Sequence, residues 1–471
     1  MNTQEAWQKQ REIIEYNKKH QPSLIEPKKA RTEAEIFKEI GISNMPINRQ
    51  KGYLRLHYQD FLVEELTQDK KIIRVNEINN EIKIDRNEKE RTLYAHLIKI
   101  GIHTNTAIDR LNERLNFPGK IGYAGLKDEE AVSAQLVAFP RIKLSEDEIK
   151  KIKIANILLT NFYYGKGNLR PGYLIGNYFT IAIRTEIEVN EAELKLRLSN
   201  LEKFGFLNYF QSQRFGGIRL ISHKIGKLIL QGNYELAVKY LLFKANEYEM
   251  PLIAGLKKQA EKIYPDYDGI IKLFEKLPYS FLYELRVIEY LKENPGDYVG
   301  ALTSISDSVT MCLYAYSSLL FNRYLSVYSK TKGCTNERFP LLISNDPEDL
   351  KIYHEYLEED GIKDVYQALK PLKFIYWTKR DWACRIFPKD IKYKIFDGGA
   401  VVYFFLPKGA YATTFLANLF ELVEGTPIPA WVSSQEIDVK KMLGQGSLDE
   451  LKQTFKEYWQ YKNTLIMKPD L

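Results

Sequence analysis

The chain of 471 residues exceeds the length at which one hydrophobic core stops growing, about 250–300 residues, so we expect two domains. Hydrophobic residues make up 45% of the chain and charged residues 27%, a composition that excludes disordered and fibrous proteins. The formal net charge of +7 favours a polyanionic partner, although a solvated lysine-rich surface gives the same charge.

The cysteines and histidines bear on metals and on the cellular compartment. Cys312, Cys334 and Cys384 lie far apart without a Cys-x-x-Cys pair, which argues against a disulfide framework and against a zinc site. The histidines show no metal-ligand spacing, so we expect no metal. No secretory signal or membrane-length apolar run is evident, and we expect a cytoplasmic protein in a reducing compartment.

The first fifty residues have the pattern of an extension. Residues 4–41 predict two polar helices with Pro22 and Pro27 between them, and they carry no catalytic constellation. We interpret residues 1–50 as an N-terminal helical extension.

A sheet is predicted to begin after this extension. The alternation over residues 53–65 is typical of a strand, and residues 71–85 have the pattern of a hairpin that turns at Asn79 and Asn80.

The next elements place a carboxylate at the edge of a strand. A strand is predicted at 93–101, and Thr104 offers an N-cap for the amphipathic helix that follows. Short apolar runs at 120–125 and 135–140 flank a loop that carries Asp128. Side chains at such an edge face a cleft, so we expect Asp128 to be accessible there.

A helix-rich insert divides the sheet. Helical periods dominate residues 220–330, including 234–246 and 308–328, whereas strand alternation returns only at 390–406. The remaining predicted elements are a strand at 173–184, a helix at 191–204 that ends at Gly205, and a polar helical tail at 436–462.

Residues 122–135 have the composition of an active-site loop. Two glycines let the backbone approach a ligand, and Lys127 places a cation beside the carboxylate of Asp128. Ser133 and Gln135 supply neutral hydrogen-bonding groups nearby. The alternative interpretation is a surface turn with a solvated run of charges.

Two further segments are candidates for binding. Residues 206–217 interleave aromatic, amide and arginine side chains, which suits the stacking of an unpaired base, although a packed helix start has the same pattern. Residues 404–413 lead from a strand into a helix whose amides could bind an anion, but a structural turn is favoured. The chain lacks a Gly-x-x-x-x-Gly-Lys-Ser/Thr phosphate loop, so nucleotide hydrolysis is not expected.

Together these segments resemble the TruD family of tRNA pseudouridine synthases, because motifs of the family occur in order over about residues 52–422. The most specific of them is Gly125-Leu-Lys127-Asp128-x-x-Ala131-x-Ser133-x-Gln135. The others are Asp60-Phe-Leu-Val63-Glu-Glu65, Leu97-Ile-Lys99-Ile-Gly101 with Thr104, Gly172-Tyr-Leu174-Ile-Gly176-Asn177-Tyr-Phe179, Asn208-Tyr-Phe210, Gln213-Arg214-Phe215-Gly216, Tyr316-Ser-Ser-Leu-Leu-Phe321-Asn322 and Leu406-Pro-Lys-Gly409-Ala-Tyr411-Ala412-Thr413.

Two positions depart from the family pattern. Ser133 replaces the usual Thr and keeps the hydroxyl, whereas Gln211 stands where the family usually has Gly. The extra side chain beside Phe210 puts the shape of the pocket and the substrate preference in doubt.

The resemblance implies an α+β fold. Residues 51–207 and 386–430 would form a pseudouridine synthase catalytic domain with a mixed, mainly antiparallel sheet flanked by helices. Residues 208–385 would form an inserted, helix-rich α/β TRUD domain, and residues 431–471 a C-terminal helical tail.

The resemblance also implies the activity, the conversion of uridine to pseudouridine in tRNA, typically at uridine 13, without a cofactor. Asp128 would be the catalytic carboxylate, and Asn208 and Phe210 would line the pocket, with Phe210 stacking on the displaced base and Asn208 hydrogen-bonding near Asp128. Lys127, also assigned to substrate binding, could help hold the charge of Asp128. The weaker substrate-binding assignments are Arg214, Lys99 and Glu65, any of which could simply brace the site.

Two other functions compete with this one. A protein that keeps the fold but acts only as an RNA-binding protein or RNA chaperone is disfavoured by the retained Lys127 and Asp128. A structural or protein-interaction role would suit the polar terminal helices but leaves the ordered motifs unexplained. We expect tRNA as the partner, no membrane or metal, and a monomer.

Overall fold

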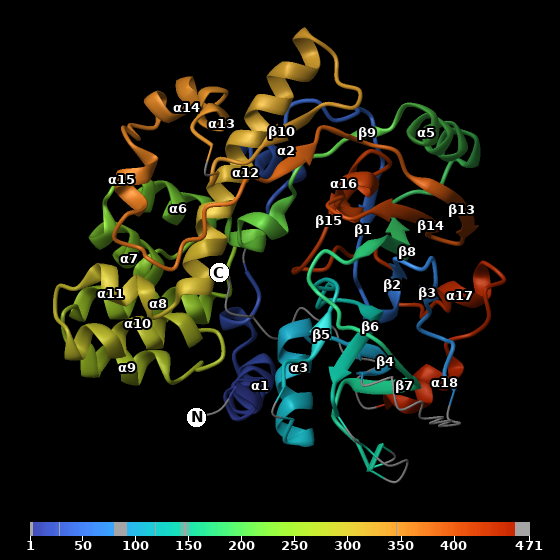
Figure 1. Ribbon diagram of the computed structural model, residues 1–471, viewed down its shortest axis with the longest axis horizontal. Coiled ribbons are helices and arrows are strands. Elements are labelled where there is room, and N and C mark those ends of the chain that lie inside the picture. Colours follow the sequence, from blue (N-terminus) through green and yellow to red (C-terminus); the bar gives the residue numbers. More distant parts are fainter. Residues whose placement is uncertain are drawn as a thin grey trace.

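The computed structural model describes residues 3–27, 29–79, 92–117, 119–142, 144, 148–149, 151–344 and 346–456. A sheet-containing unit lies beside a helix-rich unit, and the two are seen edge to edge in Figure 1. Among the described residues, no helix is both long and apolar enough to span a membrane.

The sheet has eleven strands, and its main path runs β13-β14-β8-β2-β6-β4-β7. Its pairs are antiparallel except β2 with β6 and β1 with β15, so the predicted mixed, mainly antiparallel sheet is confirmed. The strands are β1 (Lys51–Tyr53), β2 (Phe61–Thr67), β3 (Ile72–Ile73), β4 (Thr92–Ile100), β5 (Gly122–Tyr123), β6 (Val132–Pro140), β7 (Ile157–Gly165), β8 (Leu174–Thr185), β13 (Lys389–Phe396), β14 (Gly399–Pro407) and β15 (Glu421–Val423).

The predicted strand at 53–65 is wrong in its first half. The chain leaves β1, passes Arg55 with a positive φ of 58°, and makes a 3-10 turn at Tyr58–Asp60 before β2 begins. The Asp60 carboxylate fixes this turn, because it accepts the backbone N–H of His57 at 2.8 Å and pairs with buried Arg184 at 2.5 Å. Of the predicted hairpin at 71–85, β3 pairs with β2, and residues 80–85 lie outside the described residues.

The helix-rich unit begins and ends at one pair of short strands. β9 (Phe206–Leu207) pairs with β12 (Arg385–Ile386), so the chain leaves the sheet unit and returns to it at adjacent positions. A second small pair joins β10 (Arg338–Pro340) to β11 (Asp381–Ala383). The helices between β9 and β12 are α6 (Ser222–Leu230), α7 (Tyr234–Phe243), α8 (Pro251–Ile263), α9 (Tyr267–Phe274), α10 (Leu282–Glu293), α11 (Tyr298–Thr303), α12 (Ser306–Thr331), α13 (Glu348–Lys351), α14 (His354–Glu359) and α15 (Val365–Leu369).

The predicted helices were accurate where the amphipathic period and the capping residues indicated the same helix bounds. α5 (Glu191–Phe204) is confirmed, with Asn190 capping its first turn and Gly205 ending it at a positive φ of 65°. α3 (Thr104–Leu115) is present, but Thr104 is not its N-cap. The cap residue is His103, and the Thr104 hydroxyl bonds to Gln135 Oε1 at 3.2 Å instead.

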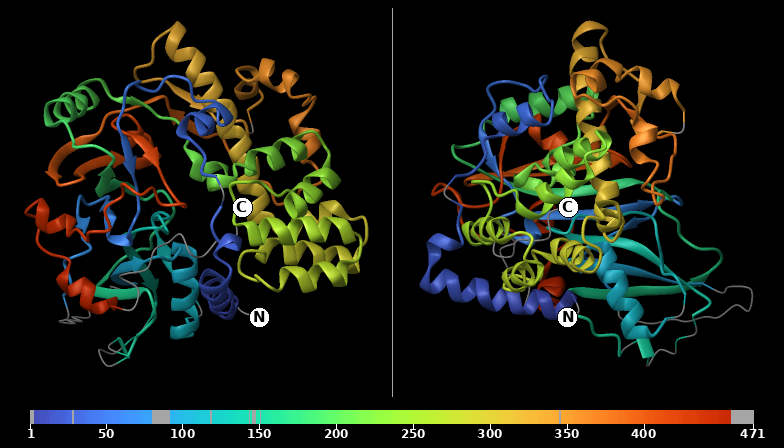
Figure 2. Two further views of the ribbon diagram at one scale, coloured as in Figure 1. Left: turned by 180° about the vertical axis from the view of Figure 1, so that it is seen from behind. Right: turned by 90° about the vertical axis from the view of Figure 1, so that its left-hand side faces the viewer.

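The N-terminal extension packs against both units. α1 (Thr3–His20) is tied to the helix-rich unit by two hydrogen bonds between Gln10 and Ser280, of 2.7 and 2.8 Å. α2 (Glu33–Glu39) begins at a capping box formed by Thr32, and its Glu33 accepts the backbone N–H of Leu422 on β15 at 3.0 Å. Figure 2 shows this blue segment running between the two units.

The described part of the helical tail predicted at 436–462 is divided into two short helices. The described part contains α17 (Val439–Met442) and α18 (Asp449–Thr454), separated by Gly444 and Gly446 at positive φ. The Asp438 carboxylate accepts N–H groups from both sides of this break, which stabilises the turn. Residues beyond 456 lie outside the described residues.

The expectation of unpaired cysteines is wrong. Cys334 and Cys384 form a disulfide with a Cα–Cα distance of 6.4 Å, across fifty residues of sequence. Spacing along the sequence could not reveal this pair, because the fold brings the loop after α12 beside β11. Cys312 is free and buried.

Candidate active site

Asp128 lies in the loop between β5 and β6, with its side chain 27% exposed. The loop backbone is fixed from the interior of the protein by Lys99, which is fully buried on β4. Its ammonium donates to the carbonyl oxygens of Ile102 and Asp128 at 2.8 Å and of Lys127 at 3.3 Å. Lys99 therefore braces the loop through these backbone carbonyls.

Lys127 turns into the interior. Its Nζ lies 2.6 Å from Oε2 of Glu65, and both side chains are only 1% exposed. The Lys127 backbone N–H donates to the Thr104 hydroxyl at 3.0 Å, and Glu65 also accepts the N–H of Leu136 at 3.3 Å. This pair joins the loop to β2 and β6, and Lys127 does not lie beside the Asp128 carboxylate.

Gln135 closes the same network from β6. Its amide nitrogen donates to the carbonyl of Gly125 at 3.1 Å, and its Oε1 accepts from Thr104. Ser133 is fully buried, and its hydroxyl has no hydrogen-bond partner among the described residues. The loop geometry is thus held by buried polar groups, which preorganise the position of Asp128.

Arg55 is the main site residue that sequence reasoning missed. Its Nη2 lies 3.5 Å from Oδ1 of Asp128 and its Nη1 3.2 Å from Oε1 of Glu424, while its side chain is 4% exposed. The guanidinium also lies over the ring of Phe61 at 4.2 Å. One buried cation therefore faces two carboxylates. The available signal was a charged residue between Leu54 and Leu56, in an apolar run.

The charged groups around Arg55 change one another's pKa. Burial opposes the charge of Arg55, but the carboxylates of Glu424, Asp128 and Glu130 together raise the pKa of its guanidinium. Burial raises the pKa of Glu424, and Arg55 offsets part of that rise. A permanently charged Arg55 favours the ionised form of a neighbouring carboxylate.

The segment after β9 supplies the opposite side of the site. Gln213 lies on a 3-10 turn, Ser212–Phe215, and its amide nitrogen is 3.5 Å from Oδ1 of Asp128. This long contact brings two segments separated by 85 residues of sequence to one carboxylate. Gln213 was part of a recognised motif but was not predicted as a site residue.

The side chain of Asn208 is bonded to the backbone. Its nitrogen donates to the carbonyls of Ala383 at 3.1 Å and Gly409 at 3.2 Å, and the backbone N–H of Asn208 donates to the carbonyl of Cys384. Its Oδ1 is buried without a hydrogen-bond partner among the described residues. The predicted hydrogen bond near Asp128 is not observed.

Phe210 is fully buried, so no ring face is open to a base. Its ring packs against Trp382, Phe321 and Tyr411 at centroid distances of 5.1, 5.4 and 5.5 Å. Arg214 covers it further, with its guanidinium 5.4 Å from the Phe210 ring and Nη2 donating to the Tyr411 hydroxyl at 2.9 Å. Base stacking on Phe210 requires these neighbours to move.

Gln211, the departure from the family pattern, points inward. Its side chain is 5% exposed, and its backbone carbonyl accepts the N–H of Arg214 at 2.9 Å. The extra side chain is therefore accommodated within the protein next to Phe210.

One group of metal-ligand type occurs among the described residues. The ligand atoms of Cys334, Glu337 and Cys384 lie within 4.8 Å of one another, but the two sulfurs are bonded to each other. Since a metal binds thiolates, this group holds none while the disulfide is intact.

Comparisons with known proteins agree with one another. The family model described as tRNA pseudouridine synthase D (TruD) matches residues 44–338, more than half of the chain. The protein named probable tRNA pseudouridine synthase D 1 of Methanocaldococcus jannaschii is 30% identical over 405 residues, which cover 80% of this chain and 99% of that protein. The tRNA pseudouridine synthase D of Aquifex aeolicus is 26% identical, over 72% of this chain and 94% of its own length.

A solved structure shares the fold. The crystal structure of a Methanosarcina mazei protein assigned as tRNA pseudouridine synthase D (TruD) superposes with a TM-score of 0.57 at 22% identity. The match covers 81% of this chain and 97% of the other. Both the sheet unit and the helix-rich unit are therefore part of one known architecture.

Proposed function

The chain belongs to the TruD family of tRNA pseudouridine synthases, and we propose that it isomerises uridine 13 of tRNA to pseudouridine with Asp128 as the catalytic carboxylate. The observation that carries this proposal is the position of Asp128. Its carboxylate is partly exposed. Arg55 approaches it from one side and Gln213 from the other.

The reaction breaks the bond from C1′ to N1, turns the uracil, and joins C1′ to C5. An ionised Asp128 acts as the nucleophile at the sugar or the base, or as the group that promotes a glycal intermediate. Arg55 places a buried guanidinium 3.5 Å from Oδ1 of Asp128, where it helps to orient the carboxylate. After C5 has bonded to C1′, C5 loses its proton and N1 takes one up, so the isomerisation needs no oxidant or reductant.

The other predicted residues divide into two roles. Lys99, Lys127 and Glu65 brace the Asp128 loop from the interior. Asn208, Phe210 and Arg214 belong to a packed aromatic wall beside the site, and we propose that this wall opens to admit the flipped base. We further infer that the protein acts as a monomer in the cytoplasm, with tRNA as its partner.

The test uses unmodified tRNA transcripts. Wild-type protein and the Asp128→Asn variant are incubated with them, and pseudouridine is mapped by carbodiimide labelling and primer extension. The proposal is supported by a primer-extension stop that maps to position 13 in the wild-type reaction. This stop should be absent with the variant and absent from a transcript with cytidine at position 13. No pseudouridine in any tested tRNA, or equal modification by the variant, contradicts it.

A further inference from the structure

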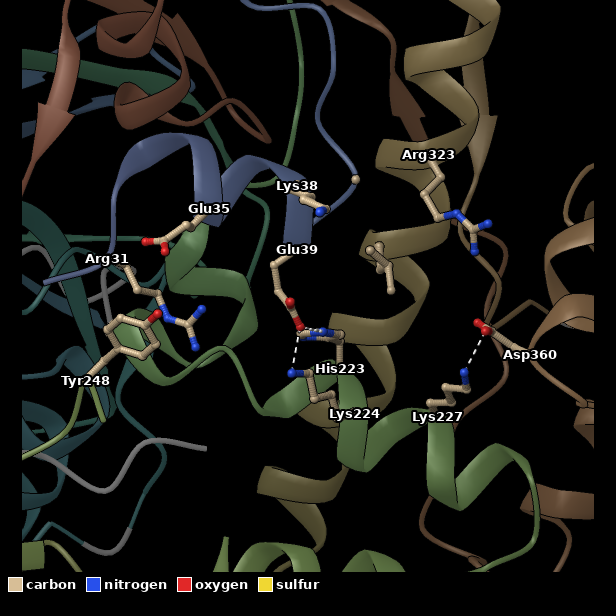
Figure 3. Close-up of a pocket in the computed structure, with 12 residues that line it drawn as sticks. Arg31, Glu35, Lys38, Glu39, His223, Lys224, Lys227, Tyr248, Arg323 and Asp360 are labelled. Carbon is tan, nitrogen blue, oxygen red and sulfur yellow. Dashed lines mark hydrogen bonds and ion pairs between the residues drawn. The ribbon is translucent and has the colours of Figure 1, made fainter. Parts of the chain in front are cut away.

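A pocket of about 660 Å³ lies between the N-terminal extension and the helix-rich unit. α2 and the segment before it form one wall, and α6 with α12 forms the other. The match to the family model begins at residue 44, after the residues of the first wall. Figure 3 shows the lining side chains arranged around an open centre.

The lining is rich in cations. Five cations face three carboxylates, and the remaining titratable groups of the lining are His223 and Tyr248. Burial lowers the pKa of His223, although Glu39 opposes this shift. The cations are Arg31, Lys38, Lys224, Lys227 and Arg323, and the carboxylates are Glu35, Glu39 and Asp360.

Ion pairs fix the floor and one side of the pocket. Glu39 accepts from Lys224 at 2.7 Å and lies 3.4 Å from Nε2 of His223, while Lys227 pairs with Asp360 at 2.6 Å. The two lysines remain 39% and 37% exposed, so their ammonium groups can reach a second anion. Both pairs are marked by dashed lines in Figure 3.

Arg31 and Lys38 have no carboxylate partner among the described residues, whereas Arg323 pairs with Glu359 at 2.5 Å. Lys38 is exposed, and no ion pair or hydrogen bond engages its ammonium among the described residues. Arg31 lies over the ring of Tyr248 at 3.9 Å and donates to the carbonyl of Ile218 at 2.8 Å, so its charge is held in place without a carboxylate. A planar cation on an aromatic ring beside the unengaged ammonium of Lys38 suits a phosphate.

The pocket is connected to the proposed active site through a short segment. Gln213, which contacts Asp128, precedes His223 by ten residues, and the rings of Phe215 and His223 meet at 5.5 Å. Even a fully extended chain of that length spans at most about 35 Å. An RNA bound at Asp128 therefore has further phosphates within reach of this pocket.

We propose that this pocket binds a backbone phosphate of the tRNA, as a second anchoring contact outside the site of chemistry. The proposal rests on the proposed function, since it takes tRNA as the bound RNA. The extension supplies Arg31 and Lys38 to this contact, and the helix-rich unit supplies Lys224, Lys227 and Arg323. The pocket gives the polar N-terminal helices a role in substrate binding.

The test measures tRNA affinity in the Asp128→Asn background over a series of salt concentrations, so that it needs no turnover. Lys38→Glu is expected to raise Kd roughly three- to tenfold and to reduce the salt slope by about one. Lys38→Gln combined with Arg323→Gln should reduce the slope by about two. Lys272→Glu on α9, exposed and outside the pocket, is the matched control for charge and should bind like the parent.

Two outcomes would overturn the proposal. The first is equal affinity and equal salt slope for Lys38→Glu, the double variant and the Lys272→Glu control. The second is a Lys38-dependent affinity for inorganic phosphate, measured by calorimetry, without any change in tRNA affinity, which would assign the pocket to a small phosphorylated ligand. Failure of the proposed function would instead be seen as absent pseudouridine in the wild-type reaction.

Discussion

Arg55 and Asp128 face each other across 3.5 Å, although they come from different parts of the sheet unit and Arg55 is almost completely buried. Glu424 shares the same guanidinium at 3.2 Å. The partner of the proposed catalytic carboxylate is thus a fixed cation on the turn between β1 and β2, and Lys127, its neighbour in sequence, is paired elsewhere.

Replacement of Arg55 should slow the reaction more than it weakens tRNA binding. Arg55→Lys keeps a charge but loses the fork that spans two carboxylates, and we expect kcat to fall about 10- to 100-fold with KM nearly unchanged. Arg55→Met should also lower the free energy of unfolding by roughly 1–2 kcal/mol, a discounted value because both carboxylates are partly exposed. Single-turnover rates and urea denaturation check the two effects, and unchanged rates for both variants would contradict the role of Arg55.

The pair of Lys127 and Glu65 should determine stability. Both side chains are buried, so Lys127→Met leaves an unpaired carboxylate and should cost about 3–5 kcal/mol in unfolding free energy. The double variant Lys127→Met with Glu65→Met should recover most of this loss. Urea denaturation of the two single variants and the double variant measures the coupling. Additive losses would show that the two side chains do not act as a pair.

The pattern of predictions that succeeded and failed has a physical basis. α5 with Gly205, α12 and the β13–β14 pair follow from local period and capping, which adjacent residues determine. The direction of Lys127 depends on Glu65, sixty-two positions away, and no local pattern contains that information.

The candidate site shows the same limit. Asp128 was located by a motif, but its surroundings combine residues 55, 213 and 424, which only the folded sheet and insert bring together. The aromatic stacking expected of Phe210 presumed an open face, whereas Trp382 and Tyr411 from distant segments cover it.

Glu39 should make the protein sensitive to acid. Hydrogen bonding to His223, followed by the effects of Lys224, lowers the pKa of Glu39 from 4.5 to about 2 despite partial burial. A lowered folded-state pKa means that Glu39 stabilises the fold above pH 4.5 and that this contribution is lost as pH falls toward 2. The difference in unfolding free energy between wild type and Glu39→Gln should therefore shrink over this window in urea titrations. A difference that stays constant with pH would contradict the assignment.

The most direct test of Asp128 as the catalytic carboxylate follows the hydrogen on C5. Pseudouridine formation replaces the C5–H bond by a C5–C1′ bond, so tRNA labelled with tritium at C5 of uridine releases the label to water. We predict release by wild type at a level matching one uridine per tRNA. Asp128→Asn should release none above background while binding the same tRNA with unchanged Kd. Release by Asp128→Asn at the wild-type rate would contradict the account.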